Sequence, residues 1–107
     1  MFSVIDAGRF DDLEHYLDPQ VVYERPGYEA YTGLPALLVF YKTVRGIREG
    51  THSIKRILCD ESSAMCSGHF EGVSKDGILI DIGFSEFYSF NGNRIKFRRT
   101  YFFQPAV

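Results

Sequence analysis

The chain has 107 residues, of which 45% are hydrophobic and 24% charged, and its formal net charge is -2. This length supports a single core, so we expect one domain over residues 1–107. The slightly acidic balance argues against nucleic acid as a partner, because phosphate binding depends on clustered lysine and arginine. No apolar run approaches the roughly 20 residues of a bilayer-spanning helix. The N-terminus has no basic segment followed by a long apolar one. These features predict a cytoplasmic protein without a membrane partner.

Two short helices are expected before the first strand. Residues 2–7 form a helix too short to be stable without packing against another element. The second helix follows Gly8, because apolar residues between Phe10 and Leu17 recur at helical intervals and Pro19 lies just beyond them. We expect this amphipathic helix to cover one side of a sheet.

The first predicted strand carries a charged residue on an apolar face. Val21, Tyr23 and Arg25 alternate on one side of the strand. Pro26 ends the pairing, because proline has no N–H to donate to a neighbouring strand. The alternation therefore directs Arg25 to the same side as Val21 and Tyr23.

The best helical pattern in the chain lies between Thr32, the predicted N-cap, and Gly46, the predicted stop. Tyr41 and Arg45 lie one helical turn apart and share a face of this helix. We expect both side chains to meet Arg25 in one concavity.

Beyond this helix the pattern changes to strands. Four strands are predicted, at residues 51–60, 64–74, 78–90 and 94–103. Asp76-Gly77 and Asn91-Gly92 are strong hairpin signals, so the four strands should form an antiparallel meander. The order of elements predicts an α+β fold with helices on one face of a curved sheet.

The face of the sheet opposite the helices should carry aromatic side chains that need to be buried. Aromatic residues make up 16% of the chain, and several in the last two strands have charged neighbours: Phe87, Phe97, Tyr101 and Phe103. A symmetric homodimer would bury this surplus. The alternative is that all the aromatic side chains fit into the core of the monomer.

The basic residues of the last strand and the two cysteines are interpreted as structural. The basic residues alternate with apolar ones, as in a solvated or partly inward-facing strand: Arg94, Lys96, Arg98 and Arg99. Cys59 and Cys66 are expected to be buried free thiols. No residues have the spacing of metal ligands, and no phosphate-binding or dinucleotide-binding loop is present, so neither a metal nor a cofactor is expected.

Five segments together resemble the NTF2-like superfamily, and within it the SnoaL-like and ketosteroid isomerase-like branch. They are D-A-G-R-F-D-D-L (6–13), V-V-Y-E-R-P-G-Y (21–28), T-G-L-P-A-L-L-V-F-Y (32–41), H-F-E-G-V-S-K-D-G (69–77) and F-S-E-F-Y-S-F-N-G-N-R-I (84–95). The resemblance implies a cone-shaped α+β fold, in which a curved antiparallel sheet and its helices surround a mostly apolar pocket. It also implies a homodimer and a small hydrophobic or oxygenated ligand.

The isomerases of this branch differ from the chain at several of their catalytic residues. Their general base precedes the proline of the first-strand motif, where this chain has Arg25, and their first-helix tyrosine has no counterpart here. Glu86 occupies the place of their oxyanion-hole carboxylic acid, and Tyr41 matches a supporting tyrosine. The resemblance therefore extends to the pocket but not to the isomerase chemistry.

If Glu86 points inward, alternation places Phe84, Tyr88 and Phe90 beside it. Desolvation would favour a protonated carboxyl group, which could act as a general acid. A guanidinium from Arg25 would instead keep it ionised, and the two would form either a working acid/base pair or a structural ion pair.

His52 is a possible second proton carrier, because its ordinary pKa suits transfer in both directions. The alternative is a histidine that only hydrogen-bonds the preceding loop. Tyr23, Tyr41, Tyr88 and Arg45 would position the ligand together with Phe84 and Phe90. The sequence thus predicts a cofactor-free acid/base enzyme of isomerase, cyclase or dehydratase type, acting on a carbonyl-bearing hydrophobic molecule. The alternative is a non-catalytic ligand-binding or dimerisation module on the same scaffold.

Overall fold

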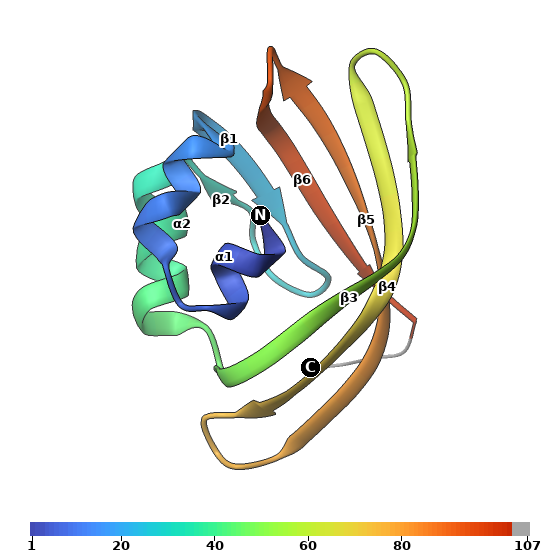
Figure 1. Cartoon of the computed structure of the whole chain (residues 1–107). Helices are drawn as coiled ribbons and strands as arrows, with labels where there is room; N and C mark the ends of the chain where they lie inside the picture. The colour runs from blue at the N-terminus through green and yellow to red at the C-terminus, as the bar shows by residue number, and fades with distance from the viewer. Residues whose placement is uncertain (104–107) are drawn as a thin grey trace.

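The computed structural model describes residues 1–103 and contains one six-stranded sheet with the helices on one side (Figure 1). Its elements in chain order are α1 (Phe2–Asp6), the 3-10 helix η1 (Phe10–His15), β1 (Leu17–Glu24), β2 (Tyr31–Thr32), α2 (Leu34–Val39), the π-helical turn η2 (Phe40–Val44), β3 (Ile47–Cys59), β4 (Ser63–Ser74), β5 (Leu79–Asn91) and β6 (Arg94–Phe102). The strand order is β2-β1-β6-β5-β4-β3. The predicted α+β cone fold is confirmed.

The predicted meander is also confirmed, because β3, β4, β5 and β6 pair in succession and antiparallel. The sheet as a whole is mixed, however. β1 pairs with β6 in parallel and with the short β2 antiparallel. The alternation within the first strand gives no information about which strand it will join, so an entirely antiparallel sheet was the wrong expectation.

Two boundaries near the N-terminus differ from the prediction. β1 begins at Leu17, and Pro19 lies inside it, where the register with β6 shifts between Leu17 and Val22. An irregular register tolerates a residue that has no N–H. The N-cap of α2 is Gly33, with φ 89, whereas Thr32 belongs to β2. Glycine fits this position because a positive φ strains other residues.

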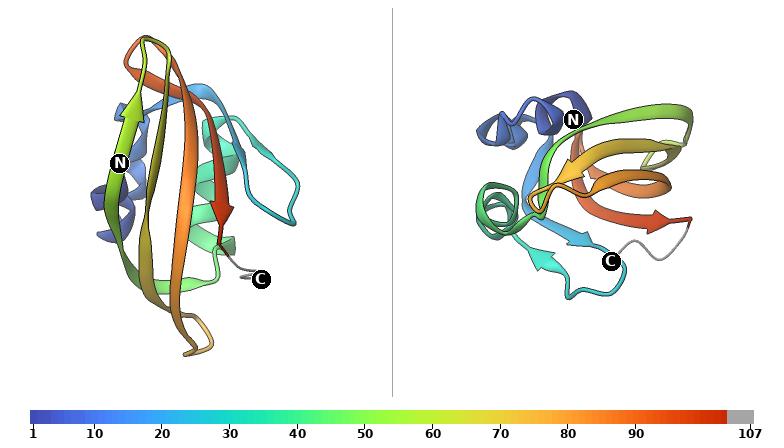
Figure 2. Two further views of the ribbon diagram at one scale, coloured as in Figure 1. Left: turned by 90° about the vertical axis from the view of Figure 1, so that its right-hand side faces the viewer. Right: turned by 90° about the horizontal axis from the view of Figure 1, so that it is seen from below.

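The long strands curve around the helices, and the core lies between the two layers (Figure 2). Leu13 of η1, Leu17 and Val21 of β1, Leu37 of α2 and Phe84 of β5 are almost completely buried there. Burial of such side chains contributes about 1.5–3 kcal/mol each. No helix within residues 1–103 combines the length and the apolar character needed to cross a bilayer.

One extra residue in β6 determines which side chains face the core. Asn91 pairs with Arg94 and Phe90 with Ile95, but Ser89 then pairs with Phe97, so Lys96 has no partner in this register. A bulge of one residue exchanges the two faces of the rest of a strand. Beyond Lys96 the buried residues of β6 are therefore Arg98 and Thr100.

Phe70 of β4 packs directly against the backbone of two glycines. Gly50 of β3 and Gly72 of β4 are paired across the two strands. A Cβ atom added to either glycine would stand less than 3.0 Å from atoms of the Phe70 ring. The two glycines therefore let the ring of Phe70 lie close against the sheet.

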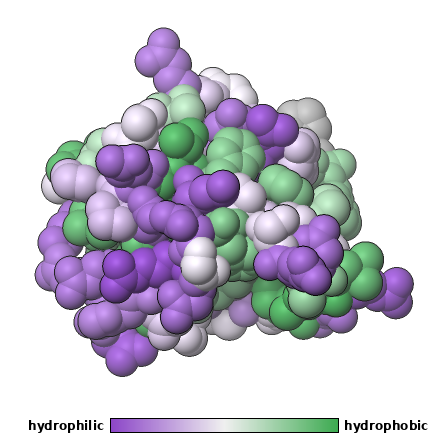
Figure 3. All heavy atoms as spheres, turned by 90° about the horizontal axis from the view of Figure 1, so that it is seen from above, coloured by the Kyte–Doolittle hydropathy of each residue, from purple (hydrophilic) through white to green (hydrophobic). Residues whose placement is uncertain are grey.

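Apolar side chains also reach the surface. Phe87 and Phe97 are half-buried with ring centroids 6.2 Å apart, and Tyr101 and Phe103 are exposed. The end of the molecule seen in Figure 3 is a mosaic of apolar and hydrophilic side chains. Of the two free thiols, Cys66 is buried, but Cys59 is exposed at the end of the edge strand β3, contrary to expectation.

Candidate functional site

A cavity of about 730 Å³ lies between the concave face of the sheet and η2. Its lining is mostly aromatic and aliphatic, with residues from all the long strands. Exposed apolar side chains belong to this lining, among them Tyr28, Val44, Ile78 and Leu79. The volume is that of a small-molecule site, since such sites usually span about 300–1,000 Å³.

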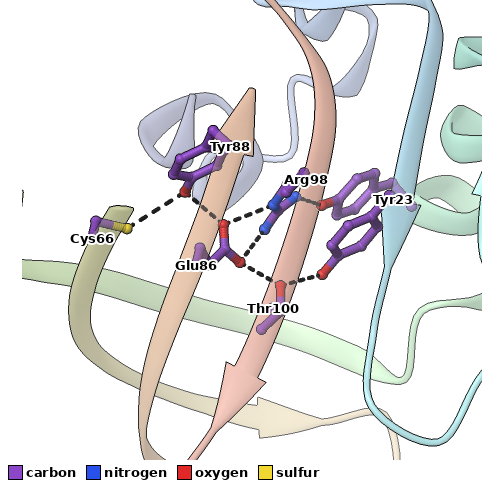
Figure 4. Close-up of polar contacts among 7 residues, drawn as sticks. Tyr23, Cys66, Glu86, Tyr88, Arg98 and Thr100 are labelled. Atoms are coloured by element: carbon purple, nitrogen blue, oxygen red, sulfur yellow. Dashed lines mark hydrogen bonds and ion pairs between the residues drawn. The ribbon is translucent and has the colours of Figure 1, made fainter. Parts of the chain in front are cut away.

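The buried carboxylate of Glu86 is the centre of the polar network in this cavity (Figure 4). Arg98 donates two hydrogen bonds of 2.8 Å to it, from Nε to Oε1 and from Nη2 to Oε2. Tyr88 donates to Oε1 at 2.6 Å and Thr100 to Oε2 at 2.5 Å. The remaining nitrogen of Arg98, Nη1, donates to the hydroxyl of Tyr41 at 2.6 Å.

The network extends further at both ends. The hydroxyls of Tyr23 and Thr100 are 3.0 Å apart, and Cys66 Sγ is 3.5 Å from the hydroxyl of Tyr88 (Figure 4). Side chains of β1, β4, β5 and β6 are thereby connected through one buried carboxylate.

The charge of Arg98 keeps Glu86 ionised. Burial alone would raise the pKa of Glu86, but the charge of Arg98 and the hydrogen bonds from Arg98, Thr100 and Tyr88 lower it below its ordinary value. Burial and the neighbouring carboxylate raise the pKa of Tyr88, so its hydroxyl stays protonated. Glu86 is thus an ionised group with every oxygen occupied, which suits neither a general acid nor a free base.

The guanidinium paired with Glu86 belongs to Arg98. The sequence had suggested Arg25 in its place. The bulge at Lys96 turns Arg98 inward, and no local pattern in the strand marks that bulge. The available signal was the pairing of β5 with β6 across the Asn91-Gly92 turn, which brings these residues near Glu86. This pairing alone does not determine whether Arg98 points inward, because that depends on the bulge at Lys96.

Arg25 lies elsewhere in the lining of the same cavity. Its Cζ atom is 4.5 Å from the ring centroid of Tyr28 and 4.5 Å from that of Phe40. Its Nε atom is shielded from solvent and has no hydrogen-bond partner among residues 1–103. Arg25 is therefore held by aromatic rings through cation–π contacts rather than by a carboxylate.

His52 and Asp6 form a second polar pair in the lining, one that sequence reasoning did not find. The Nδ1 atom of His52 is 2.6 Å from Oδ1 of Asp6, and the backbone N–H of His52 donates to Oδ2 at 2.8 Å. The imidazole stacks on Phe2 and also contacts Phe70 and Phe84. Asp6 was hidden because α1 is short and nothing in its sequence reveals its neighbour in β3.

Burial lowers the pKa of His52 below its ordinary value of 6.5, although the hydrogen bond and charge of Asp6 oppose this change. The imidazole is therefore neutral at pH 7. Asp6 occupies Nδ1, while Nε2 has no hydrogen-bond partner within residues 1–103. A neutral histidine oriented by a carboxylate can accept a proton at its free nitrogen.

The other predicted site residues divide into two groups. Tyr23, Tyr41, Arg45 and Phe84 line the cavity together with Glu86, Arg25 and His52. Tyr88 is buried behind the lining as a donor to Glu86, and Phe90 packs against the core outside the cavity.

Arg45 lies above the rings of Tyr41 and Phe70, at 5.5 and 5.9 Å from their centroids. Burial lowers the pKa of Arg45, and no carboxylate within residues 1–103 forms an ion pair with it. Since Phe70 also contacts His52, the guanidinium of Arg45 and the imidazole lie near the same ring.

A cluster of half-buried and exposed side chains on β4 and β5 has the composition of metal ligands. His69, Glu71 and Asp81 place one ligand atom each within 4.8 Å of one another, and His69 contacts Asp81. His69 and Glu71 lie close together on β4, but Asp81 comes from β5, so their spacing in the sequence did not reveal the cluster. All three side chains are at least partly exposed.

The family model for the SnoaL-like domain matches residues 1–103. No curated protein sequence matches the chain. Among solved structures, a SnoaL-like polyketide cyclase from Jannaschia sp. CCS1 is 11% identical, with a TM-score of 0.79 over 94% of this chain and 80% of the other. An LEH-like epoxide hydrolase from M. tuberculosis is 18% identical, with a TM-score of 0.81 over 94% and 75%. TerC, co-crystallised with polyporic acid, is 12% identical, with a TM-score of 0.84 over 94% and 84%.

Proposed function

The chain belongs to the SnoaL-like domain family, and from this premise we propose that it is a cofactor-free acid/base enzyme acting on a small carbonyl-bearing hydrophobic molecule. The reaction would be of isomerase, cyclase or dehydratase type. The observation that carries the proposal is the pair of His52 and Asp6 in the lining of the cavity. A structural neighbour that was co-crystallised with polyporic acid supports a small-molecule ligand.

His52 takes the role of general base in this proposal. Its Nε2 atom would remove a proton from a carbon beside the carbonyl group, while Asp6 holds Nδ1 and stabilises the imidazolium that forms. The guanidinium of Arg45 would stabilise the negative charge that develops on the carbonyl oxygen. Glu86 and Arg98 then serve as a scaffold that orients Tyr41 and Thr100.

The ring opening of 5-nitrobenzisoxazole tests this base without knowledge of the natural substrate. A base removes the proton at C3, the ring N–O bond breaks, and a coloured cyanonitrophenolate is released. We expect turnover whose rate rises with pH and has its midpoint below pH 6.5, because burial lowers the pKa of His52 from 6.5. His52→Gln should reduce this rate by about 10²-fold or more.

His69→Gln is the matched control, because His69 also contacts a carboxylate, that of Asp81, but lies outside the lining of the cavity. It should leave the rate unchanged. Equal rates in wild type and His52→Gln, with both folded by circular dichroism, would contradict the assignment of His52.

A non-catalytic binding module is the second candidate, and one observation favours it. Every oxygen of Glu86 is already hydrogen-bonded within the protein, as expected for a structural ion pair. Under this alternative the cavity binds the same class of ligand without turning over the benzisoxazole.

A homodimer and a cytoplasmic location are also part of the proposal. Exposed Tyr101 and Phe103 support the dimer, since a partner subunit would cover them.

A further inference from the structure

The charges that line the cavity do not cancel. The lining contains three arginines and two carboxylates: Glu86 is paired with Arg98, and the exposed Asp81 contacts His69, which lies outside the lining. Arg25 and Arg45 also belong to the lining, and neither forms an ion pair within residues 1–103. The lining therefore has an excess of positive charge in largely apolar surroundings, which favours an anionic ligand.

Arg25 shows the clearest need for a partner. A buried donor without an acceptor costs free energy, more so for a charged group, and the Nε atom of Arg25 is such a donor among residues 1–103. The ring centroids of Tyr28 and Phe40 each lie 4.5 Å from the Cζ atom of Arg25, and neither ring accepts a hydrogen bond from its N–H groups. Within residues 1–103, the Nε–H of this guanidinium has no acceptor.

We propose that the cavity binds an apolar carboxylic acid and that Arg25 holds its carboxylate. The inference rests on the proposed function in so far as both place a ligand in the same cavity. A carboxylate is planar and accepts two parallel hydrogen bonds from the edge of a guanidinium. A phosphate carries more charge, so its desolvation beside the rings of Tyr28 and Phe40 would cost more.

The two unpaired arginines contact different parts of the lining. Arg45 lies over Tyr41 and Phe70, beside His52, whereas Arg25 lies over Tyr28 and Phe40. The carboxylate at Arg25 is thus separate from the group that reacts at His52. The ligand class is an apolar body with an acidic group at one position and a carbonyl group at another.

Calorimetric titration with 2-naphthoate and 2-naphthamide tests the inference, because the two probes have the same ring system and differ in charge. Wild type should bind the naphthoate about tenfold or more tightly than the amide, the effect of one charge-assisted contact. Arg25→Gln should abolish this preference and leave the affinity for the amide within about twofold. Arg25→Lys, which keeps the charge but not the planar pair of donors, should fall between the two.

Arg48→Gln is the control, since Arg48 is exposed and lies outside the lining. It should behave as wild type. A preference that persists in Arg25→Gln, or that disappears only in Arg45→Gln, would overturn the assignment to Arg25. Equal affinity of wild type for both probes, or binding of neither, would overturn the inference as a whole.

The outcome of the calorimetric titration is independent of the benzisoxazole test of His52. Preference for the acid without benzisoxazole turnover would refute the proposed chemistry and leave the carboxylate site intact. Benzisoxazole turnover without any preference for the acid would refute the carboxylate site and leave the proposed chemistry intact.

Discussion

Glu86 and Arg98 show how strongly a buried charge depends on its partner. Their side chains are only 2% and 3% exposed and share two hydrogen bonds. Arg98→Met would leave the carboxylate buried without its cation. We expect this change to lower the free energy of unfolding by about 3–5 kcal/mol, as measured by urea denaturation.

Arg99→Met is the neighbouring control. Arg99 pairs with Glu24 at 2.7 Å, but both side chains are substantially exposed. Its loss should cost less than about 1 kcal/mol. In the double variant Glu86→Leu, Arg98→Met neither charge remains, so it should be more stable than Arg98→Met alone. Equal costs for Arg98→Met and Arg99→Met would show that the buried pair has no special role.

At the scale of single residues, the family resemblance pointed to Glu86 as a pocket residue but not to its partner. Alternation along one strand is a local property, so an inward Glu86 implied an inward Phe84, and both are buried. The partner depends on the register between two strands, which one unpaired residue, Lys96, is enough to change. Asp6 was missed for a related reason, since its contact with His52 joins elements far apart in the chain.

The hairpin of β3 and β4 forms one wall of the cavity through Phe70. Because Gly50 leaves room for this ring, Gly50→Ala would force the ring to move. We expect a loss of stability of about 1–3 kcal/mol from overpacking. Since Phe70 contacts His52, benzisoxazole turnover should fall as well. Denaturation curves and the rate assay measure the two effects.

Gly46→Ala is the corresponding control, because a Cβ atom at Gly46 meets nothing within 4 Å. Its effect on stability should stay within about 0.5 kcal/mol. If Gly50→Ala were equally neutral, the close packing of Phe70 on the glycine backbone would not matter.

At the scale of elements, the sequence predicted the strands of the meander and their turns within a few residues. The Asn91-Gly92 turn gives both the hairpin and its starting register, since the ladder continues directly from it. The partner of β1 could not be predicted in this way. β1 joins β6 in parallel from the far end of the chain, a contact without any local signal.

The stability of the whole molecule should fall on acidification in two steps. Burial lowers the pKa of His52 from 6.5, so below this pH the unfolded chain binds protons that the folded chain does not. For Glu86, burial alone would raise the pKa, but Arg98 lowers it below the ordinary 4.5, so the second loss begins near that pH. Both contributions are complete above the ordinary pKa values and decrease as the pH falls.

Urea denaturation at several pH values measures this profile. In His52→Gln the decrease between pH 7 and pH 5 should be smaller than in wild type, while the decrease below pH 4.5 should remain. A wild-type stability that rises between pH 7 and pH 5 would contradict the lowered pKa of His52.

The separation between the polar network and the exposed part of the cavity lining has an evolutionary consequence. Glu86 and Arg98 connect the strands at the inside, whereas Ile78 and Leu79 belong to the lining but are largely exposed. Substitutions at exposed positions usually cost little folding energy. Ligand preference can therefore drift, or be redesigned, through these peripheral positions, while the residues that maintain the architecture stay unchanged.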